Sequence, residues 1–186
     1  MEGLIFWLTG LSGSGKSTLA EAVGMKLKAE GISYTIVDGD IVRSNYQKPL
    51  GLSEVEIKKN NYLISDYCIG IRSNVKVVLV SVISPYASMR RETRKKLTPG
   101  YFEVYCNADL NSVINRDVKG LYKKALAGTI TNMIGLAESH PYEKPEHPDL
   151  EISTGVGGES RETSIEILYN FVKNNINGSA SGKQSC

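Results

Sequence analysis

The segment Gly10-Leu11-Ser12-Gly13-Ser14-Gly15-Lys16-Ser17 decides the fold of this chain. It satisfies the pattern G-x-x-x-x-G-K-[ST] of a phosphate-binding loop at every fixed position. An apolar run over residues 4–8 predicts a buried strand before the loop, and apolar residues at helical spacing over 19–27 predict a helix after it. A chance Gly/Ser turn is the alternative, but motif and context together favour a site for a nucleoside triphosphate.

The chemistry of such a loop assigns roles to its residues. Glycines let successive backbone N–H groups point at phosphate oxygens, and the start of the helix adds the positive end of its dipole. Lys16 can then reach the β- and γ-phosphates as a catalytic group, and the Ser17 hydroxyl can ligate Mg²⁺. The residues expected to bind the donor nucleotide here are Gly10, Ser12, Gly13, Ser14, Gly15, Lys16, Ser17 and Thr18.

Length and composition limit the remaining possibilities. A chain of 186 residues, with 41% hydrophobic and 23% charged residues, predicts one globular domain over 1–176, followed by a flexible Gly/Ser-rich tail over 177–186. A net charge of +2 is too small to indicate binding to nucleic acid or to an acidic membrane surface. Because no apolar run approaches the ~20 residues of a membrane span and no signal peptide is recognisable, we expect a cytoplasmic protein without membrane contact.

Apolar strands alternate with amphipathic helices along the chain, which is typical of a parallel sheet. The predicted fold class is α/β: a three-layer P-loop NTPase-type parallel sheet with helices on both faces. Strands are expected over 4–8, 34–37, 77–83 and 101–106, and helices over 54–71, 89–97 and 159–172, with another beginning near Asp109. A loop rich in Pro, Glu and His is expected over 137–149.

Polar residues follow two of these strands at the edge where open α/β sheets bind ligands. Asp38 and Asp40 end the second strand and could hold Mg²⁺ through water or accept a proton from an attacking hydroxyl. The alternative is that Asp-Gly-Asp is only a turn. Ser84 ends the third strand and could touch substrate or be structural, and Arg43 could anchor an anion or be a solvated surface residue.

A basic segment over 116–124 places four cations, Arg116, Lys119, Lys123 and Lys124, in a short stretch. Such a segment can form a lid over the nucleotide, although many charge runs are solvated faces. No Asn-Lys-x-Asp motif is present, which disfavours a GTPase.

Several ordered motifs closely resemble the adenylylsulfate (APS) kinase family from residue 3 to about residue 171. They are Gly-Leu-Ser-Gly-Ser-Gly-Lys-Ser-Thr at 10–18, Asp-Gly-Asp-x-x-Arg at 38–43, Leu-Gly-x-Ser at 50–53, Asn60, Ile-Ser-Pro-Tyr at 83–86, Lys-Gly-Leu-Tyr-Lys-Lys at 119–124 and Pro-Tyr-Glu-x-Pro at 141–145.

The resemblance implies transfer of the ATP γ-phosphoryl group to the 3′-hydroxyl of a nucleotide that carries a 5′ phosphoanhydride. It implies that Asp38 supports the metal, that Asp40 orients or deprotonates the hydroxyl, and that Ser84 matches a serine phosphorylated in some members. Arg116 would contact ATP, and a homodimer is implied as well. The implied acceptor-binding residues are Asp40, Arg43, Leu52, Asn60, Ile83, Ser84, Pro85, Lys119, Gly120, Leu121 and Met133.

Three departures from the family pattern lie on the acceptor side. Leu52 and Met133 stand where the family has phenylalanines that sandwich the acceptor adenine, and Ile57 stands where it has an arginine. The segment 135–141 is also longer than usual. Three hypotheses stay open. The first is an APS kinase in which Leu52 and Met133 pack against the acceptor base in place of the two phenylalanines. The others are a relative that acts on another nucleotide, such as cytidine diphosphoramidate, and a non-catalytic nucleotide-binding module.

Overall fold

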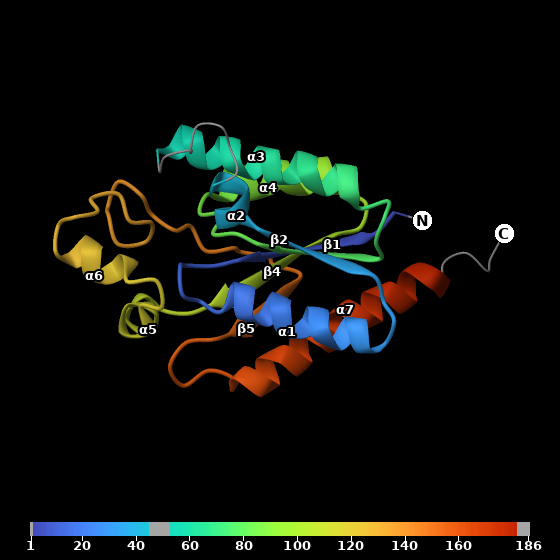
Figure 1. Ribbon diagram of the computed structural model, residues 1–186. Helices are drawn as coiled ribbons and strands as arrows, with labels where there is room; N and C mark the ends of the chain where they lie inside the picture. Colours follow the sequence, from blue (N-terminus) through green and yellow to red (C-terminus); the bar gives the residue numbers. More distant parts are fainter. Residues whose placement is uncertain (1, 45–52, 182–186) are drawn as a thin grey trace.

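The fold is a five-stranded parallel sheet covered by helices on both faces (Figure 1). The computed structural model describes residues 2–44 and 53–181. The strands stand in the order β2-β3-β1-β4-β5 and are β1 (Leu4–Thr9), β2 (Tyr34–Asp38), β3 (Val77–Ser81), β4 (Tyr101–Asn107) and β5 (Leu150–Ser153). The helices are α1 (Lys16–Ala29), α2 (Gly39–Ser44), α3 (Glu54–Ile71), α4 (Ala87–Leu97), α5 (Leu110–Arg116), α6 (Leu121–Leu126) and α7 (Arg161–Ser181).

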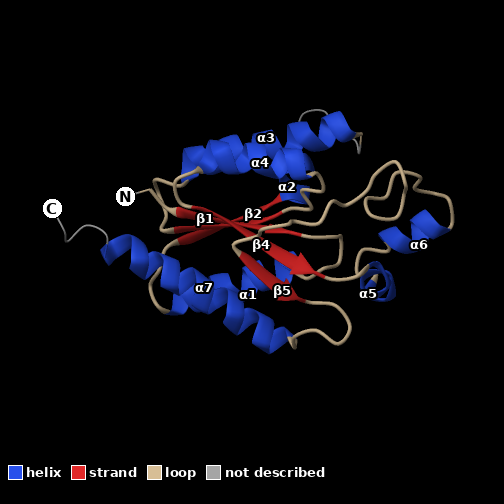
Figure 2. Cartoon of the chain, turned by 180° about the vertical axis from the view of Figure 1, so that it is seen from behind, coloured by secondary structure: helices blue, strands red, loops and turns tan. Residues whose placement is uncertain are grey.

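The helices form two layers on opposite sides of the sheet. Helices α3 and α4 cover one face and α1 and α7 cover the other, as both views show (Figures 1 and 2). The short helices α5 and α6 lie beyond the carboxyl ends of the strands (Figure 2). The predicted three-layer α/β class is therefore confirmed.

Strand β1 is apolar along its whole length because both of its faces are covered. Phe6 and Leu8 pack toward α1 and α7, in a core that also holds Leu168. Ile5 and Trp7 pack in the other core, toward α3 and α4. A strand buried on both faces reads as a continuous apolar run, which is why the sequence pattern identified it.

Most predicted elements are found within a few residues of their expected bounds. Helix α3 spans Glu54–Ile71 as predicted, and its start is fixed by a capping box between Ser53 and Glu56. Strand β3 ends at Ser81, two positions before the expected end, because the chain then turns through Ser84, which has φ 46°. Strand β5 was not predicted, since it is short and only Ile152 in it is buried.

Helix α7 extends past residue 176, the expected end of the domain. Residues 177–181, expected to belong to a flexible tail, continue helix α7, which ends at Ser181. Ile176 packs against the core and the Asn175 side chain donates to the Phe171 carbonyl, so the contacts of α7 with the core reach residue 176. Among the described residues, no helix has the length and apolar character needed to cross a membrane.

Packing of helix α7 against the sheet should contribute strongly to the free energy of unfolding. Leu168 is fully buried between α7 and the sheet, so Leu168→Ala leaves a cavity and is expected to lower the free energy of unfolding by about 2–5 kcal/mol. Urea denaturation measures this loss. Met25→Ala, on the exposed side of α1 with 64% of its surface accessible, is the matched control. Equal stability of the two variants would contradict the packing of α7 described here.

Candidate active site

The phosphate-binding loop connects β1 to α1 and meets the sheet at its centre. Gly15 adopts φ 93° directly before α1, a left-handed conformation that side chains rarely take. At Gly10, a Cβ would lie 2.6 Å from both the Ser14 hydroxyl and the Cys106 carbonyl. The loop can therefore fold tightly over β4 only with glycine at these two positions.

Lys16 lies at the centre of this loop. Its ammonium donates to the carbonyls of Gly10 (2.9 Å) and Leu11 (2.7 Å), and only 8% of the residue is exposed. Burial disfavours the charged form and lowers the pKa of Lys16 to about 8. The buried position and the lowered pKa suit a lysine whose charged form is stabilised further when an anion binds beside it.

Three oxygen-bearing side chains converge next to Lys16, at the ends of β2 and β3. The Ser17 hydroxyl donates to Asp38 at 3.0 Å and lies 2.9 Å from the Ser81 hydroxyl. Hydroxyl and carboxylate oxygens are the donors that Mg²⁺ prefers, and the cation takes its other ligands from phosphate and water. In the part of the chain that the structure describes, no three His, Cys, Asp or Glu residues gather to hold a metal by themselves, so this pair fits a metal shared with a nucleotide.

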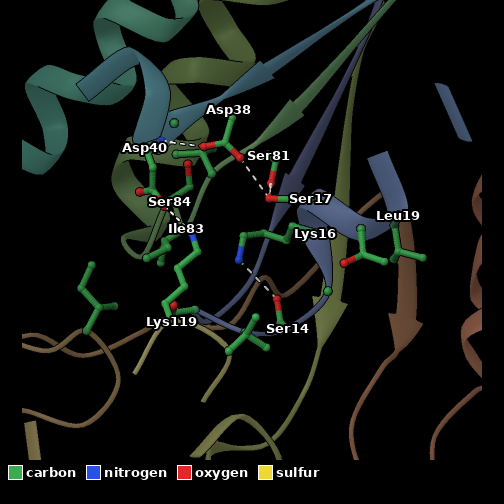
Figure 3. Close-up of a pocket in the computed structure, with 18 of the residues that line it drawn as sticks. Ser14, Lys16, Ser17, Leu19, Asp38, Asp40, Ser81, Ile83, Ser84 and Lys119 are labelled. Atoms are coloured by element: carbon green, nitrogen blue, oxygen red, sulfur yellow. Dashed lines mark hydrogen bonds and ion pairs between the residues drawn. The ribbon is translucent and has the colours of Figure 1, made fainter. Parts of the chain in front are cut away.

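Asp40 stands two residues after Asp38, at the start of α2. Its backbone N–H donates to Asp38 at 2.8 Å, and its carboxylate pairs with the ammonium of Lys119, from the loop between α5 and α6. Figure 3 shows Lys119 reaching toward Asp40. Because both side chains are at least half exposed, the pair adds little stability, and it can exchange for other partners.

Ser84 occupies the acceptor-side wall and is only 1% exposed. Its hydroxyl accepts from Trp7 Nε1 at 2.9 Å and donates to Asn61 Oδ1. Both hydrogen-bonding functions of this hydroxyl are thus used inside the protein. The predicted catalytic role of Ser84 would require it to leave these partners.

Asn60 is fully buried and lines the same wall. Its amide nitrogen lies 3.4 Å from the Gly39 carbonyl, while its Oδ1 has no hydrogen-bond partner among the described residues. A buried amide oxygen without a partner is costly unless a ligand satisfies it. This observation supports the acceptor-binding role predicted for Asn60.

One cavity of about 430 Å³ brings most of the predicted residues together. The predicted residues that line it are Ser12, Gly13, Ser14, Gly15, Lys16, Ser17, Thr18, Asp38, Asp40, Asn60, Ile83, Ser84, Pro85, Arg116 and Lys119. Arg116 also donates to the Gly13 carbonyl (3.4 Å) and to the Thr154 carbonyl. The donor and acceptor sides predicted separately are thus continuous.

Other predicted residues lie elsewhere. Met133 does not line this cavity: it is 5% exposed and packs with Leu11, Val113 and Tyr122, while its neighbour Ile134 lines the wall. The two neighbours thus belong to different clusters, and Ile134 packs with Ile57 of α3 and Met89 of α4.

Gly120 and Leu121 also lie off the cavity wall. Gly120 is the N-cap of α6, and Leu121 begins that helix and packs in the same cluster as Met133. Arg43 belongs to α2, but its side chain is outside the described part of the structure, and Leu52 lies outside the described residues.

Sequence reasoning missed part of the donor side. Thr154 follows the unpredicted strand β5, and its hydroxyl donates to the Ser14 carbonyl at 2.9 Å. Arg161 and Ser164, from the first turn of α7, line the cavity as well. A prediction of β5 would have identified this edge, but its four residues carry too weak a pattern.

Comparisons with known proteins agree with this geometry. The family model for adenylylsulphate kinase matches residues 2–153. An adenylyl-sulfate kinase of Microcystis aeruginosa is 44% identical over 169 residues, which cover 91% of each chain. A probable adenylyl-sulfate kinase of Pseudomonas aeruginosa is 43% identical over 95% of this chain and 78% of its own length.

Solved structures give the same result. The APS kinase of Mycobacterium tuberculosis in complex with AMPPNP and APS superposes with a TM-score of 0.80 at 36% identity, covering 90% of this chain and 96% of that one. A hexameric APS kinase from Thiobacillus denitrificans is 27% identical with a TM-score of 0.62, and the match covers 96% of this chain and 29% of that chain.

The lowered pKa of Lys16 predicts a proton linkage. A bound triphosphate favours the charged ammonium and raises this pKa again. Above about pH 8, the pKa of Lys16 in the protein without nucleotide, ATP binding should therefore take up a proton. Affinity should fall as pH rises in this range, by at most about tenfold per pH unit.

Calorimetric titration at pH 9 in two buffers of different ionisation enthalpy measures the uptake. The same titration at pH 7, where Lys16 is already charged, is the control and should show little uptake from this group. Absence of uptake at pH 9 would mean that the buried ammonium is fully charged before the nucleotide binds.

Proposed function

The chain belongs to the adenylylsulphate kinase family of P-loop phosphotransferases, and from this premise we propose that it phosphorylates the 3′-hydroxyl of APS with ATP as donor. In this reaction the acceptor O–H bond breaks, a bond forms between that oxygen and the γ-phosphorus, and ADP leaves. The observation that carries the proposal is the single cavity that joins the phosphate loop to Asp40 and the Ser84 wall.

On the donor side, catalysis is mainly a matter of position and charge. Phosphoryl transfer needs little covalent participation by the protein, because the negative charge that spreads over the transferred group is the main obstacle. Loop N–H groups and Lys16 hold the phosphates, and Arg116 adds a cation at the cavity wall. Among the side chains of the loop, Lys16 at the start of α1 is the one long enough to reach the β- and γ-phosphate oxygens.

Mg²⁺ fits the oxygen pair of Ser17 and Asp38, which lie 3.0 Å apart. When bound there, the cation would neutralise charge on the donor phosphates. We propose that Ser17 contacts it directly and that Asp38 supports it, while the Ser81 hydroxyl fixes the direction of Ser17.

On the acceptor side, Asp40 is the carboxylate placed to orient the 3′-hydroxyl or to receive its proton. Lys119 holds Asp40 in the structure and lines the same cavity, so it can pass to a phosphate oxygen when both substrates are present. Such an exchange would free the Asp40 carboxylate for the hydroxyl. Asn60, with its unpartnered amide oxygen, would accept a hydrogen bond from the acceptor.

A second candidate keeps the chemistry and changes the acceptor, and one observation favours it. Ile57 is 1% exposed and packs with Tyr86, Met89 and Ile134, so this wall is apolar where the family pattern has an arginine. An apolar wall suits a smaller base and a less anionic 5′ terminus, as in cytidine diphosphoramidate.

The homodimer implied by the resemblance also stays a prediction, which light scattering of the protein in solution checks.

The acceptor is identified by ADP release with Mg²⁺-ATP and either APS or cytidine diphosphoramidate. For APS we expect a kcat/KM of ~10⁴ M⁻¹s⁻¹ or more, the usual enzymatic range. Lys16→Ala is the control and should lose turnover with both acceptors. Slow turnover of APS with fast turnover of the cytidine compound would replace the first candidate by the second, and no turnover with either would reject both.

Asp40→Asn separates transfer from donor binding. The amide keeps the size of the side chain but cannot receive a proton, so transfer should fall by about 10²–10⁴-fold while ATP affinity changes by less than about twofold. Single-turnover kinetics and ATP titration measure the two quantities. Asp66→Asn, an exposed residue paired with Lys96 on the outer side of α3, is the matched control. Unchanged transfer in Asp40→Asn would exclude Asp40 from the chemistry.

A further inference from the structure

The backbone at Ser84 adopts a strained conformation that contacts from other segments of the chain must stabilise. Ser84 has φ 46°, and among the described residues only one other non-glycine residue, Asp117, has a positive φ. A non-glycine residue in the left-handed region is strained and persists only when its surroundings fix it. The surroundings of this turn therefore decide the shape of the acceptor wall.

Arg90, in α4, supplies one of the contacts that hold the turn, beside the Thr9 hydroxyl, which lies 3.4 Å from the Ser84 carbonyl. Arg90 is 3% exposed, and one of its terminal nitrogens donates to the Ser84 carbonyl at 2.7 Å. The other donates to the Glu143 carbonyl at 2.7 Å, and Nε lies 3.2 Å from a carboxylate oxygen of Glu103. The planar guanidinium thus connects the turn, the loop before β5 and strand β4, which a lysine ammonium of one nitrogen could not do.

The loop that carries Glu143 is joined to the same turn a second time. The Glu143 N–H donates to the Pro85 carbonyl at 2.8 Å, and its carboxylate accepts from the Ala87 N–H at 2.6 Å. Arg90 therefore holds the turn and its covering loop as one unit.

The backbone turn at Ser84 also fixes the groups that face the acceptor. The Ser84 hydroxyl is bonded to Trp7 and to Asn61, and Asn61 directly follows Asn60 on α3. Ile83 and Pro85, on either side of Ser84, line the cavity. A change in the Ser84 backbone would displace these wall groups first, because the phosphate loop meets the turn through a long contact, from the Gly10 N–H to the Ile83 carbonyl at 3.4 Å.

We propose that Arg90 is a positioning residue for the acceptor nucleotide: by holding Ser84 in its left-handed conformation, it sets the wall formed by Asn60, Ile83 and Pro85. The proposal rests on the proposed function, in which this wall faces the acceptor. Arg90 itself touches no substrate, since its nitrogens are bonded to protein groups behind the wall.

Arg94 provides a matched control on the same helix. It lies 3.8 Å from the Glu103 carboxylate, pairs with Asp149 at 2.6 Å and stacks on Tyr101. It therefore shares the ion-pair network of Arg90, but within the described part of the chain it forms no hydrogen bond or ion pair with Ser84 or Glu143. Loss of Arg94 should weaken the network without moving the turn.

The experiment compares Arg90→Met, Arg90→Lys and Arg94→Met with the unaltered protein. In both Arg90 variants the KM for the acceptor should rise at least about tenfold, while the KM for ATP stays within about twofold. Arg94→Met should leave both constants within about twofold. Arg90→Lys keeps a cation beside Glu103, so it provides a folded variant if Arg90→Met proves unstable.

Trp7, the only tryptophan of the chain and fully buried, gives a readout that is independent of turnover. Because its indole N–H donates to Ser84, its fluorescence emission should shift in the Arg90 variants and not in Arg94→Met. An unchanged acceptor KM in a folded Arg90 variant, or equal effects of Arg90→Met and Arg94→Met, would overturn the proposal. If the unaltered protein phosphorylates no acceptor, the proposed function fails, and an unshifted Trp7 emission in both Arg90 variants would separately overturn the role of Arg90.

Discussion

Strand β1 lies at the centre of the sheet, and its parallel pairing with β3 and β4 fixes where every functional segment emerges. Parallel strands end at a common edge, so the residues that follow β1, β2 and β3 meet there although they are distant in sequence. The phosphate loop, Asp38 and Ser84 are brought together in this way. The two apolar cores on either side of β1 keep this register, because a slip would expose residues that are fully buried.

The edge of the sheet concentrates polar groups that burial would penalise if they were not bonded. Lys16 is satisfied by loop carbonyls, and Thr9, at the end of β1, donates to the Ile83 carbonyl at 2.6 Å and lies 2.9 Å from the Tyr142 hydroxyl. In the cavity wall, the amide oxygen of Asn60 has no partner within residues 2–44 and 53–181. A site whose own groups are satisfied except where substrate is expected is preorganised, so that little rearrangement opposes the reaction.

The two sides of the cavity are built differently. The donor side consists of loop backbone and cations anchored on β1, α1 and α5, and it follows the family pattern closely. The acceptor side is held from behind by the Arg90–Glu103 pair and is walled by Ile57 and Ile134. A family can change its acceptor by altering this wall, since the groups that handle the triphosphate are attached to other elements.

The sequence alone determined the fold class, the phosphate loop and the family, because each depends on local patterns: a buried strand, glycines at fixed spacing and a helix start. It also predicted most residues of the cavity, from Lys16 to Lys119. Tertiary structure decided what depends on packing between distant segments. Residue Ile134, not Met133, lines the wall, because Met133 packs into a separate apolar cluster. Thr154 reaches the loop from a strand too short to be recognised. The clamp of Arg90 on Ser84 joins residues from α4, β4 and two loops, and no spacing in the sequence encodes a contact that only the folded chain creates.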